Sequence, residues 1–474
     1  MSTALIDEVL AWSDRRPDAP AIVSTRMSMT FGELGSAVRR TASRLRQLGV
    51  KPGEVVGLHA VPEWEAVLTL AVLHEGAVSL HASAPVSAAY GDRIALHLGR
   101  APGSTGAAGR TIDVDEQFIA SLGAVNPLID PRLVADGGVV RVVFSSGTTG
   151  TPKGIAFTEA GLRARTDSAR SNWMPADPFF CLLGIDTVSG FQTFAWSMLH
   201  GEPWIVPGDG RANAELLSRV AARSIKTSPA RLAELLDALE STGSSLSALQ
   251  TVQVAGSLLS AILIRRCEAV TGVRPVYLYG STEAGTITFG VADPENPARL
   301  GTAVNGAELR VLDDDGVTVV EPGAIGIIEY RTEATADAYW ARVVEPSPFR
   351  DGWFRPGDRG ALDEQGVLEL AGRTDDLINA GGAKVNLADL DRRLAELDLV
   401  RDAATFAYEL PGGLTAIGVV YASDSVVTAD VFAQRIREAL PGVDIRSLLR
   451  VDAVPRNPRG KVSRQQLAAL LGES

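Results

Sequence analysis

A strand-like run of apolar residues from Val142 leads directly into a loop of small hydroxyl residues that ends at Lys153. Backbone amides of a Gly-rich loop can point inward, hydroxyls can donate hydrogen bonds, and the lysine supplies one cation, which together suit a phosphate. The spacing is not the Gly-x-x-x-x-Gly-Lys-Ser/Thr of P-loop enzymes, and a flexible polar turn is the alternative interpretation. The candidate phosphate-binding residues are Ser145, Ser146, Gly147, Thr148, Thr149, Gly150, Thr151 and Lys153.

Two carboxylates and a second lysine could serve the same chemistry, although each also has an ordinary explanation. Glu283 offers a hard oxygen ligand for a divalent cation, but it also suits the start of a helix after Ser281 and Thr282. Asp358 in "RPGD" is a typical turn residue. Lys461 lies in the basic cluster "RNPRGKVSR", and charge runs usually form solvated faces. Taken singly, these residues leave both interpretations open.

The composition predicts a multidomain protein located in the cytoplasm. With 474 residues the chain is too long for one compact domain, and 46% hydrophobic residues support a sizeable core. The net charge of −12 argues against nucleic-acid or acidic-membrane binding. The chain has only two cysteines and neither a signal-peptide pattern nor an apolar run near the roughly 18 residues of a membrane helix.

The candidate residues must be positioned by an α/β fold, because strand-like and helix-like runs alternate up to about residue 330. Examples are "EVVGLHA" before "EWEAVLTLAVLHEG", "EPWIVPG" before "NAELLSRVAARS", and "ALQTVQVAG" before "LLSAILIRRCEAVTG". This alternation predicts parallel sheets covered by helices on both faces. Short β-runs separated by Gly and Asp turns from about 300 to 372 predict a small β-rich subdomain, as a barrel or sheet.

We expect two domains from these changes of pattern. Residues 1–374 form a large domain, which includes the β-rich subdomain. Residues 375–474, with "LADLDRRLAEL", "TAIGVVYAS" and "ADVFAQRIREAL", read as helix, strand and helix and form a small α+β module.

Four segments in fixed order carry a resemblance to a known family. They are "SSGTTGTPKG" (145–154), "VYLYGSTEAG" (276–285), "DGWFRPGDRGALDEQGVLELAGRTDDLINAGGAKVN" (351–386) and "PRNPRGKVSR" (455–464). Together with "RPDAPAIV", "TFGEL" and "LRQLGVKPGEVVGL" near the start, they resemble the adenylate-forming (ANL) superfamily of acyl-CoA synthetases, luciferases and peptide-synthetase adenylation domains. The resemblance covers essentially the whole chain. It implies that residues 1–374 bind ATP and the acyl substrate, and that residues 375–474 form a mobile domain that carries the catalytic lysine.

The resemblance implies that a carboxylate is joined to the α-phosphate of ATP with release of pyrophosphate. That nucleophile is already an anion at pH 7, so the reaction needs cations and dipoles more than a general base. The five histidines all lie outside the motifs, in agreement. By resemblance, Glu283 holds Mg²⁺, Thr282 points at the α-phosphate, and Lys461 reaches both the substrate carboxylate and the α-phosphate.

Other positions are implied to bind the nucleoside. Asp358 and Arg373 correspond to the ribose-binding residues. Tyr279, beside Gly280, either stacks on adenine or only packs, and Gly256 corresponds to the strand end near the adenine, where a small residue could also simply allow close packing.

The acyl pocket departs from the pattern of many acyl-CoA synthetases, because "GIDTVSGFQTF" keeps Gly190 but has Thr187 where a histidine would fall. Asp186 corresponds to the aspartate that binds the amino group in peptide synthetases, although a capping or turn carboxylate is the alternative. Because "AGGAKVN" and "YGSTE" resemble the acyl- and aryl-CoA ligases more closely, we expect an uncharged apolar acid, with an amine-bearing acid as the second hypothesis. The expected pocket residues are Asp186, Thr187, Gly190, Phe191 and Ala255.

The second half-reaction is expected to transfer the acyl group to a thiol after the C-terminal module rotates about a hinge at Asp375, with Asp376 as the less favoured pivot. "INAGGAKVNLADLD" resembles CoA ligases more than peptide synthetases, so coenzyme A is the expected acceptor and the phosphopantetheine arm of a separate carrier protein is the alternative. Two further hypotheses, a catalytically inactive nucleotide-binding protein and a luciferase-like oxygenase, have less support in the sequence.

Overall fold

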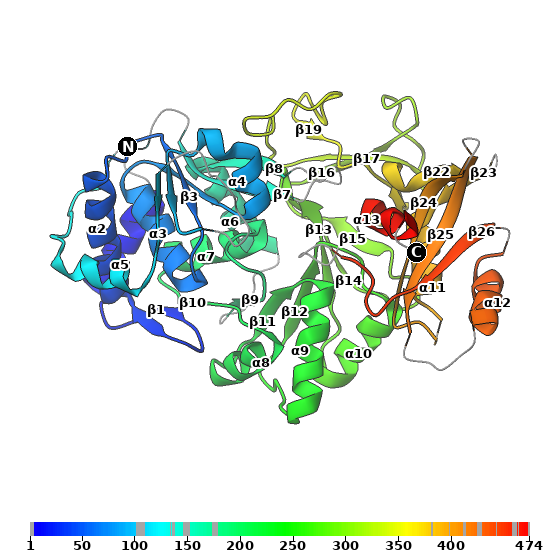
Figure 1. Cartoon of the computed structure of the whole chain (residues 1–474), viewed down its shortest axis with the longest axis horizontal. Coiled ribbons are helices and arrows are strands. Elements are labelled where there is room, and N and C mark those ends of the chain that lie inside the picture. Colours follow the sequence, from blue (N-terminus) through cyan, green and yellow to red (C-terminus); the bar gives the residue numbers. More distant parts are fainter. Residues whose placement is uncertain are drawn as a thin grey trace.

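A computed structural model describes residues 4–100, 110–132, 134, 138–145, 152–172, 179–380, 383–397, 399–410, 414–423, 429–441, 443–456, 462 and 464–472. Figure 1 shows an elongated α/β molecule in which the N-terminal elements lie at one end, the elements around β11–β13 lie in the middle, and the C-terminal elements lie at the other end. The expected α/β class is confirmed. Among the described helices, none has the length and apolar composition that crossing a membrane requires.

The N-terminal end is built around a six-stranded sheet in the order β6-β5-β3-β4-β7-β8, parallel except for the last pair. Helix α3 is mostly apolar and is buried on nearly every side, including the side chains of Glu63 and Glu65. The elements are α1 (Ala4–Arg15), β1 (Pro20–Val23), β2 (Ser28–Thr30), α2 (Phe31–Gln47), β3 (Val55–Leu58), α3 (Pro62–His74), β4 (Val78–His81), α4 (Ala84–Tyr90), η1 (Gly91–Arg93), β5 (Leu96–Leu98), β6 (Arg110–Ile112), α5 (Glu116–Ser121), η2 (Leu122–Ala124), β7 (Val139–Ser145) and β8 (Lys153–Thr158).

The central part is a second parallel set, β9-β11-β12-β13, which continues through antiparallel strands into one large sheet. Helices α8, α9 and α10 cover one face with a large apolar cluster, and α7 packs against β9. The elements are α6 (Glu159–Asn172), β9 (Phe179–Cys181), α7 (Val188–His200), β10 (Trp204–Ile205), α8 (Gly210–Arg219), β11 (Ser224–Thr227), α9 (Pro229–Thr242), β12 (Thr251–Ala255), α10 (Ala261–Thr271), β13 (Val276–Ser281), β14 (Gly285–Val291) and β15 (Arg299–Ala303).

One of the strands predicted from the strand–helix alternation does not belong to the central sheet. The segment "EPWIVPG" forms only the short strand β10, which pairs with β1 in a separate three-stranded sheet. The reason lies in packing: Trp204 is buried against Phe194 in the N-terminal core, which fixes this segment away from the central sheet.

The β-rich segment after β15 is continuous with the central sheet, because β21 pairs with β15 and β20 pairs with β21. Its hydrogen-bonded ladder therefore extends the sheet that carries β13 and β14. The elements are β16 (Glu308–Leu312), β17 (Gly326–Arg331), β18 (Phe349–Arg350), β19 (Trp353–Phe354), β20 (Asp358–Leu362), β21 (Val367–Arg373) and η3 (Thr374–Asp376).

The C-terminal elements have their own apolar core, in which α11 and α12 pack on a three-stranded sheet in the order β24-β25-β26. In Figure 1 this part, in orange and red, forms the end of the molecule at which β22 and β23 are labelled. Its elements are β22 (Leu377–Ala380), β23 (Ala383–Asn386), α11 (Leu387–Leu394), β24 (Asp402–Leu410), β25 (Leu414–Ala422), α12 (Ala429–Ala439), β26 (Ile445–Arg450), α13 (Arg464–Ala469) and η4 (Leu470–Gly472).

Candidate active site

Thr282 and Glu283 lie in the tight connection between β13 and β14. No helix begins there, because Ser281 ends one strand and Gly285 begins the next in an antiparallel hairpin. Glu283 is nonetheless only 6% exposed. Its Oε1 accepts hydrogen bonds from the hydroxyl of Tyr339 at 3.2 Å and from Ser145 Oγ at 3.4 Å. The alternative of an ordinary residue at a helix start is therefore wrong.

Arg165 holds the backbone of this connection from helix α6. Its Nη2 donates to the carbonyl oxygens of Thr282 at 3.0 Å, Glu283 at 3.3 Å and Ala334 at 3.0 Å. Burial lowers the pKa of Arg165 to about 10, with the charge of Glu283 opposing the shift, so the guanidinium is still charged at pH 7. One buried cation thus fixes the hairpin connection and neutralises part of the charge of Glu283.

The start of the candidate phosphate loop meets the Glu283 carboxylate. Ser145 and Lys153 are partners in the β7–β8 ladder, and the Lys153 Nζ lies 5.2 Å from the ring centroid of Tyr339. The ends of β7 and β8 therefore converge with the β13–β14 connection on one tyrosine. The six loop residues from Ser146 to Thr151 lie outside the described residues.

A Mg²⁺ ion fits this arrangement through one carboxylate. Within the described ranges, no group of three or more His, Cys, Asp or Glu side chains gathers as a metal cage. Mg²⁺ commonly uses one or two carboxylates and completes its shell with water and substrate phosphates. Glu283, buried next to the expected phosphate loop, has the donor chemistry for that mode of binding.

Asp358 and Arg373 are brought together by the β20–β21 ladder, in which they are direct partners. Their closest charged atoms are 3.7 Å apart, and the Arg373 Nη2 donates to the carbonyl oxygen of Pro356 at 2.8 Å. The Tyr279 hydroxyl donates to Asp358 Oδ2 at 2.7 Å. Burial and the neighbouring Asp358 charge raise the pKa of Tyr279, so it remains a neutral donor.

Two glycines beside this group meet backbone constraints. A side chain at Gly280 would collide with the carbonyl oxygen of Gly285 on the opposite strand. Gly256, at the end of β12, has φ of +97°, which side chains rarely adopt. These constraints explain why glycine stands at both positions next to the candidate nucleoside site.

The start of helix α7 carries four of the expected pocket residues. Thr187 is the N-cap: its Oγ1 accepts from the Gly190 amide at 3.0 Å and donates to the Gly184 carbonyl at 2.8 Å. The capping role weighed for Asp186 is therefore filled by Thr187. Phe191 is buried between Phe157 and Phe194 in the N-terminal core.

Asp186 lies near a buried charged network formed by Glu65 of α3, His81 at the end of β4 and Arg141 of β7. Arg141 donates to Glu65 at 3.0 Å and to the Ile185 carbonyl at 3.2 Å, and Glu65 also contacts His81 at 2.9 Å. Burial opposes protonation of His81, but Glu65 and then Asp186 outweigh it and raise its pKa.

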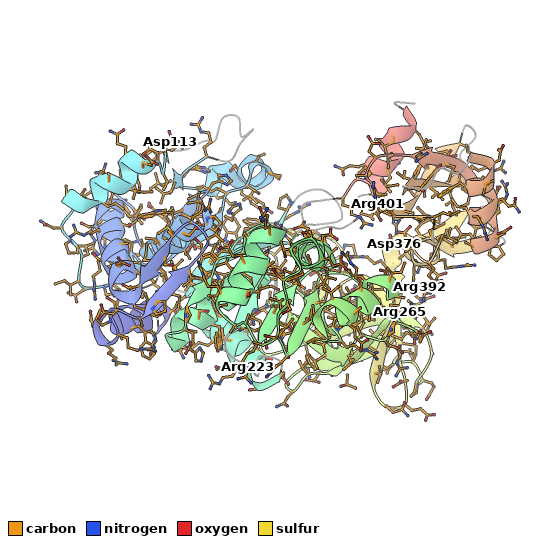
Figure 2. All side chains as sticks on the ribbon, turned by 90° about the horizontal axis from the view of Figure 1, so that it is seen from below. Asp113, Arg223, Arg265, Asp376, Arg392 and Arg401 are labelled. Atoms are coloured by element: carbon orange, nitrogen blue, oxygen red, sulfur yellow. The ribbon has the colours of Figure 1, made fainter. Side chains whose placement is uncertain are left out.

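The segment predicted to contain the hinge is tied to the C-terminal elements. Asp375 lies in the 3-10 turn η3 that joins β21 to β22, and nothing is described of its side chain. The Asp376 carboxylate accepts from Arg464 Nε at 2.7 Å, and Arg464 also pairs with Asp391 at 3.0 Å. Figure 2 shows Asp376 where the chain passes into the C-terminal part, near Arg392. Asp376 is thereby anchored to the C-terminal elements, which fits a pivot at the preceding residue.

A surface hollow of about 420 Å³ lies elsewhere, beside α2, α5 and η2. None of the predicted site residues lines it. We assign the chemistry to the convergence of motif residues, because charge and hydrogen-bond geometry rather than the size of a hollow distinguish a phosphate site.

Comparison with known proteins agrees with this geometry. The family model of the AMP-binding enzymes matches residues 9–97 and 108–340, more than half of the chain. The chain belongs to the AMP-binding enzyme family. It is thus a member of the adenylate-forming superfamily, as the four motifs predicted.

Relatives of this chain include proteins whose names give different acceptors. The chain is 26% identical to the fatty acid–acyl-carrier-protein ligase MmaC of Mycobacterium marinum, over 99% of this chain and 98% of that protein. It is 28% identical to an indenyl-propanoyl:CoA ligase of Mycobacterium tuberculosis, over 96% of each. The phosphinothricin tripeptide synthetase PhsC of Streptomyces viridochromogenes is 29% identical over 97% of this chain, which spans only 44% of PhsC.

The fold is shared with solved AMP-binding enzymes. The o-succinylbenzoate CoA synthetase of Bacillus subtilis, in complex with an acyl-adenylate, superposes with a TM-score of 0.83 at 21% identity over 98% of each chain. This likeness extends over the large N-terminal part of the chain and over the small C-terminal part.

Two members of the site were not found from the sequence. Arg165 and Tyr339 contact the Glu283 connection from α6 and from the segment after β17, at sequence separations of more than 50 residues. Neither lies in a motif that could have indicated it. Lys461, the expected catalytic lysine of the AMP-binding enzyme, lies outside the described residues, whereas Arg456 and Arg464 on either side pair with acidic residues.

Proposed function

We propose that this chain activates a carboxylic acid as an acyl-AMP and then transfers the acyl group to a thiol, with coenzyme A as the acceptor. The observation that carries the proposal is the convergence of Ser145, Glu283 and Tyr339, with Asp358 and Arg373 on the strands of the same sheet. Family membership supports the first half-reaction, and the CoA acceptor rests on the form of the "INAGGAKVNLADLD" segment.

In the first step a carboxylate oxygen attacks the α-phosphorus of ATP, and the bond to the bridging oxygen of pyrophosphate breaks. No proton transfer is required, so the chain's task is to lower the repulsion between two anions. The loop from Ser145 to Lys153 and Lys461 would supply donors and positive charge, and Glu283 would hold Mg²⁺. Bound Mg²⁺ would neutralise charge on the phosphate oxygens. Arg165 would keep Glu283 and Thr282 at a fixed place during the reaction.

In the second step a thiolate sulfur attacks the acyl carbon, AMP leaves, and the thiol proton passes to solvent. Asp358, oriented by Tyr279 and Arg373, would bind the ribose hydroxyls in both steps. A rotation at Asp375 would exchange Lys461 for the β22–β23 hairpin at the active site. The alternative acceptor is a phosphopantetheine arm on a separate carrier protein, which the likeness to MmaC favours.

A panel of carboxylic acids in ATP–pyrophosphate exchange tests the first step, because exchange reports reversible acyl-AMP formation without an acceptor. Thioester formation is then measured with coenzyme A and, separately, with phosphopantetheinylated carrier proteins. Exchange without any CoA thioester but with carrier loading would select the alternative acceptor. Absence of exchange with every acid would refute the proposed function.

A further inference from the structure

Lys226 is a basic residue buried inside the central sheet. It lies on β11, is 4% exposed, and is in register with Cys181 on β9 and Gln253 on β12. Arg223 immediately precedes the same strand, and Figure 2 shows it on the outside of the molecule. The two basic residues of this segment therefore have very different environments. A buried lysine is rare unless it is paired.

The strand register decides which face of the sheet carries Lys226. Residues in register on neighbouring parallel strands point to the same side, and successive residues alternate. Ile225, on the other side, packs in the apolar cluster under α8, α9 and α10. The Cys181 thiol, on the side of Lys226, is hydrogen-bonded to Thr193 of α7. Lys226 therefore belongs to the face of the sheet that α7 covers.

This face also carries the expected acyl pocket. Ala255 follows Gln253 by two residues on β12, so it lies on the same face about 6–7 Å nearer the carboxyl end of the strands. Gly190 precedes Thr193 by three residues on α7 and so shares its helix face. Lys226 therefore lies on the same face as Ala255 and Gly190, two residues predicted to line the acyl pocket, and farther than Ala255 from the carboxyl end of the strands.

No anion of the described residues neutralises Lys226. Among the described residues, Cys181 is the only ionisable group with an electrostatic effect on the Lys226 amine. Burial raises the pKa of the Cys181 thiol, so this thiol is uncharged at pH 7. Burial correspondingly lowers the pKa of Lys226. An uncompensated buried cation destabilises a fold, and an anionic group arriving with a ligand would remove that penalty.

We propose that Lys226 binds a second acidic group of the substrate, so that the substrate is a dicarboxylic acid with a short spacer rather than an uncharged apolar acid. The proposal rests on the proposed function. Along the strand direction, Ala255 lies about 6–7 Å from Gln253, the register partner of Lys226. This spacing and the length of a lysine side chain fit a substrate with a few carbons between its two carboxylates.

The test compares α,ω-dicarboxylates of three to six carbons with the monocarboxylates of equal length in ATP–pyrophosphate exchange. We expect the wild-type protein to prefer the diacid. The Lys226→Met variant keeps the length of the side chain without its charge and should lose about 10- to 150-fold in kcat/KM for the diacid, the range of a charge-assisted hydrogen bond. Its activity with the monoacid should stay equal or rise. The matched control, Arg223→Met, removes an exposed charge from the same segment. It should change the activity neither with the diacid nor with the monoacid.

Thermal denaturation supplies a second readout that needs no catalysis. Lys226→Met should melt at or above the wild-type temperature without ligand, because it removes a buried unpaired charge. The best diacid should raise the melting temperature of the wild type and of Arg223→Met but not of Lys226→Met. In the same panel, Asp186→Asn tests for an amino group: a selective loss with aspartate over succinate would identify an amino diacid.

The outcomes separate the two proposals. Equal exchange with monoacids and diacids, unchanged by Lys226→Met, would overturn the role of Lys226 and leave adenylation intact. No exchange with any acid would refute the proposed function, while a diacid-dependent rise in melting temperature that requires Lys226 would still support the acidic-group site. If Lys226→Met did not fold, absence of a diacid preference in the wild type would overturn the inference.

Discussion

The hydrogen bond from Tyr279 to Asp358 gives a quantitative test of the nucleoside site. Tyr279→Phe removes one hydroxyl that donates to a carboxylate oxygen at 2.7 Å. A hydrogen bond to a charged group contributes about 1.5–3 kcal/mol, or roughly 10- to 150-fold in binding. Arg373 remains beside Asp358, and the Asp358 side chain is 15% exposed, so water can replace part of the lost bond.

We therefore expect the lower end of that range, about a tenfold weaker Kd for ATP, because Asp358 is no longer held in the orientation proposed to bind the ribose. The maximal rate of adenylation should change only a few-fold, since the hydroxyl bonds to Asp358 and not to the α-phosphate. Isothermal titration calorimetry measures the ATP affinity without an acid substrate, and ATP–pyrophosphate exchange against ATP concentration gives the KM.

Tyr277→Phe is the matched control. Tyr277 lies two residues earlier on β13 and is buried, and its hydroxyl accepts from the Leu259 amide at 3.1 Å rather than contacting Asp358. This variant should lose about 1–3 kcal/mol of stability, because the buried amide is left without its acceptor, but it should bind ATP normally. If Tyr279→Phe binds ATP with wild-type affinity and only lowers the melting temperature, Tyr279 supports packing and the assigned orientation of Asp358 is refuted.

The remaining predictions concern metal, catalysis and hinge. Glu283→Gln should lower the rate sharply and recover partly at high Mg²⁺, because an amide is a poorer ligand for a hard cation; an unchanged Mg²⁺ titration would show a structural role. Lys461→Ala should reduce adenylation by roughly 10²-fold or more but spare thioester formation from synthetic acyl-AMP, and equal loss of both steps would contradict the assignment. Asp375→Pro should keep adenylation within about tenfold while thioester formation falls much further, since proline fixes φ near −65°; full activity in both steps would move the pivot to Asp376.

Some of the site is local in sequence and could be predicted. The β7 strand followed by a Ser/Thr/Gly loop, and the β-runs that carry Asp358 and Arg373, depend on residue types and short spacings that a single segment contains. Asp358 and Arg373 then become ladder partners because they lie on successive strands of one antiparallel pair. The order of these segments was sufficient to predict the family, which the family comparison confirmed.

Other features were decided only by tertiary structure. Nothing near Arg165 or Lys226 in the sequence distinguishes them from the many exposed basic residues of the chain. Arg165 contacts carbonyl oxygens more than 110 residues away, and Lys226 is buried by the register of β11 between β9 and β12. Periodicity in a four-residue strand cannot reveal which neighbours flank it. The sequence by itself determined the fold class and the order of the ATP motifs, because those depend on local patterns. Strand register and long-range packing determined which charges face Glu283 and which face the expected acyl pocket, because such contacts exist only once distant segments have been brought together.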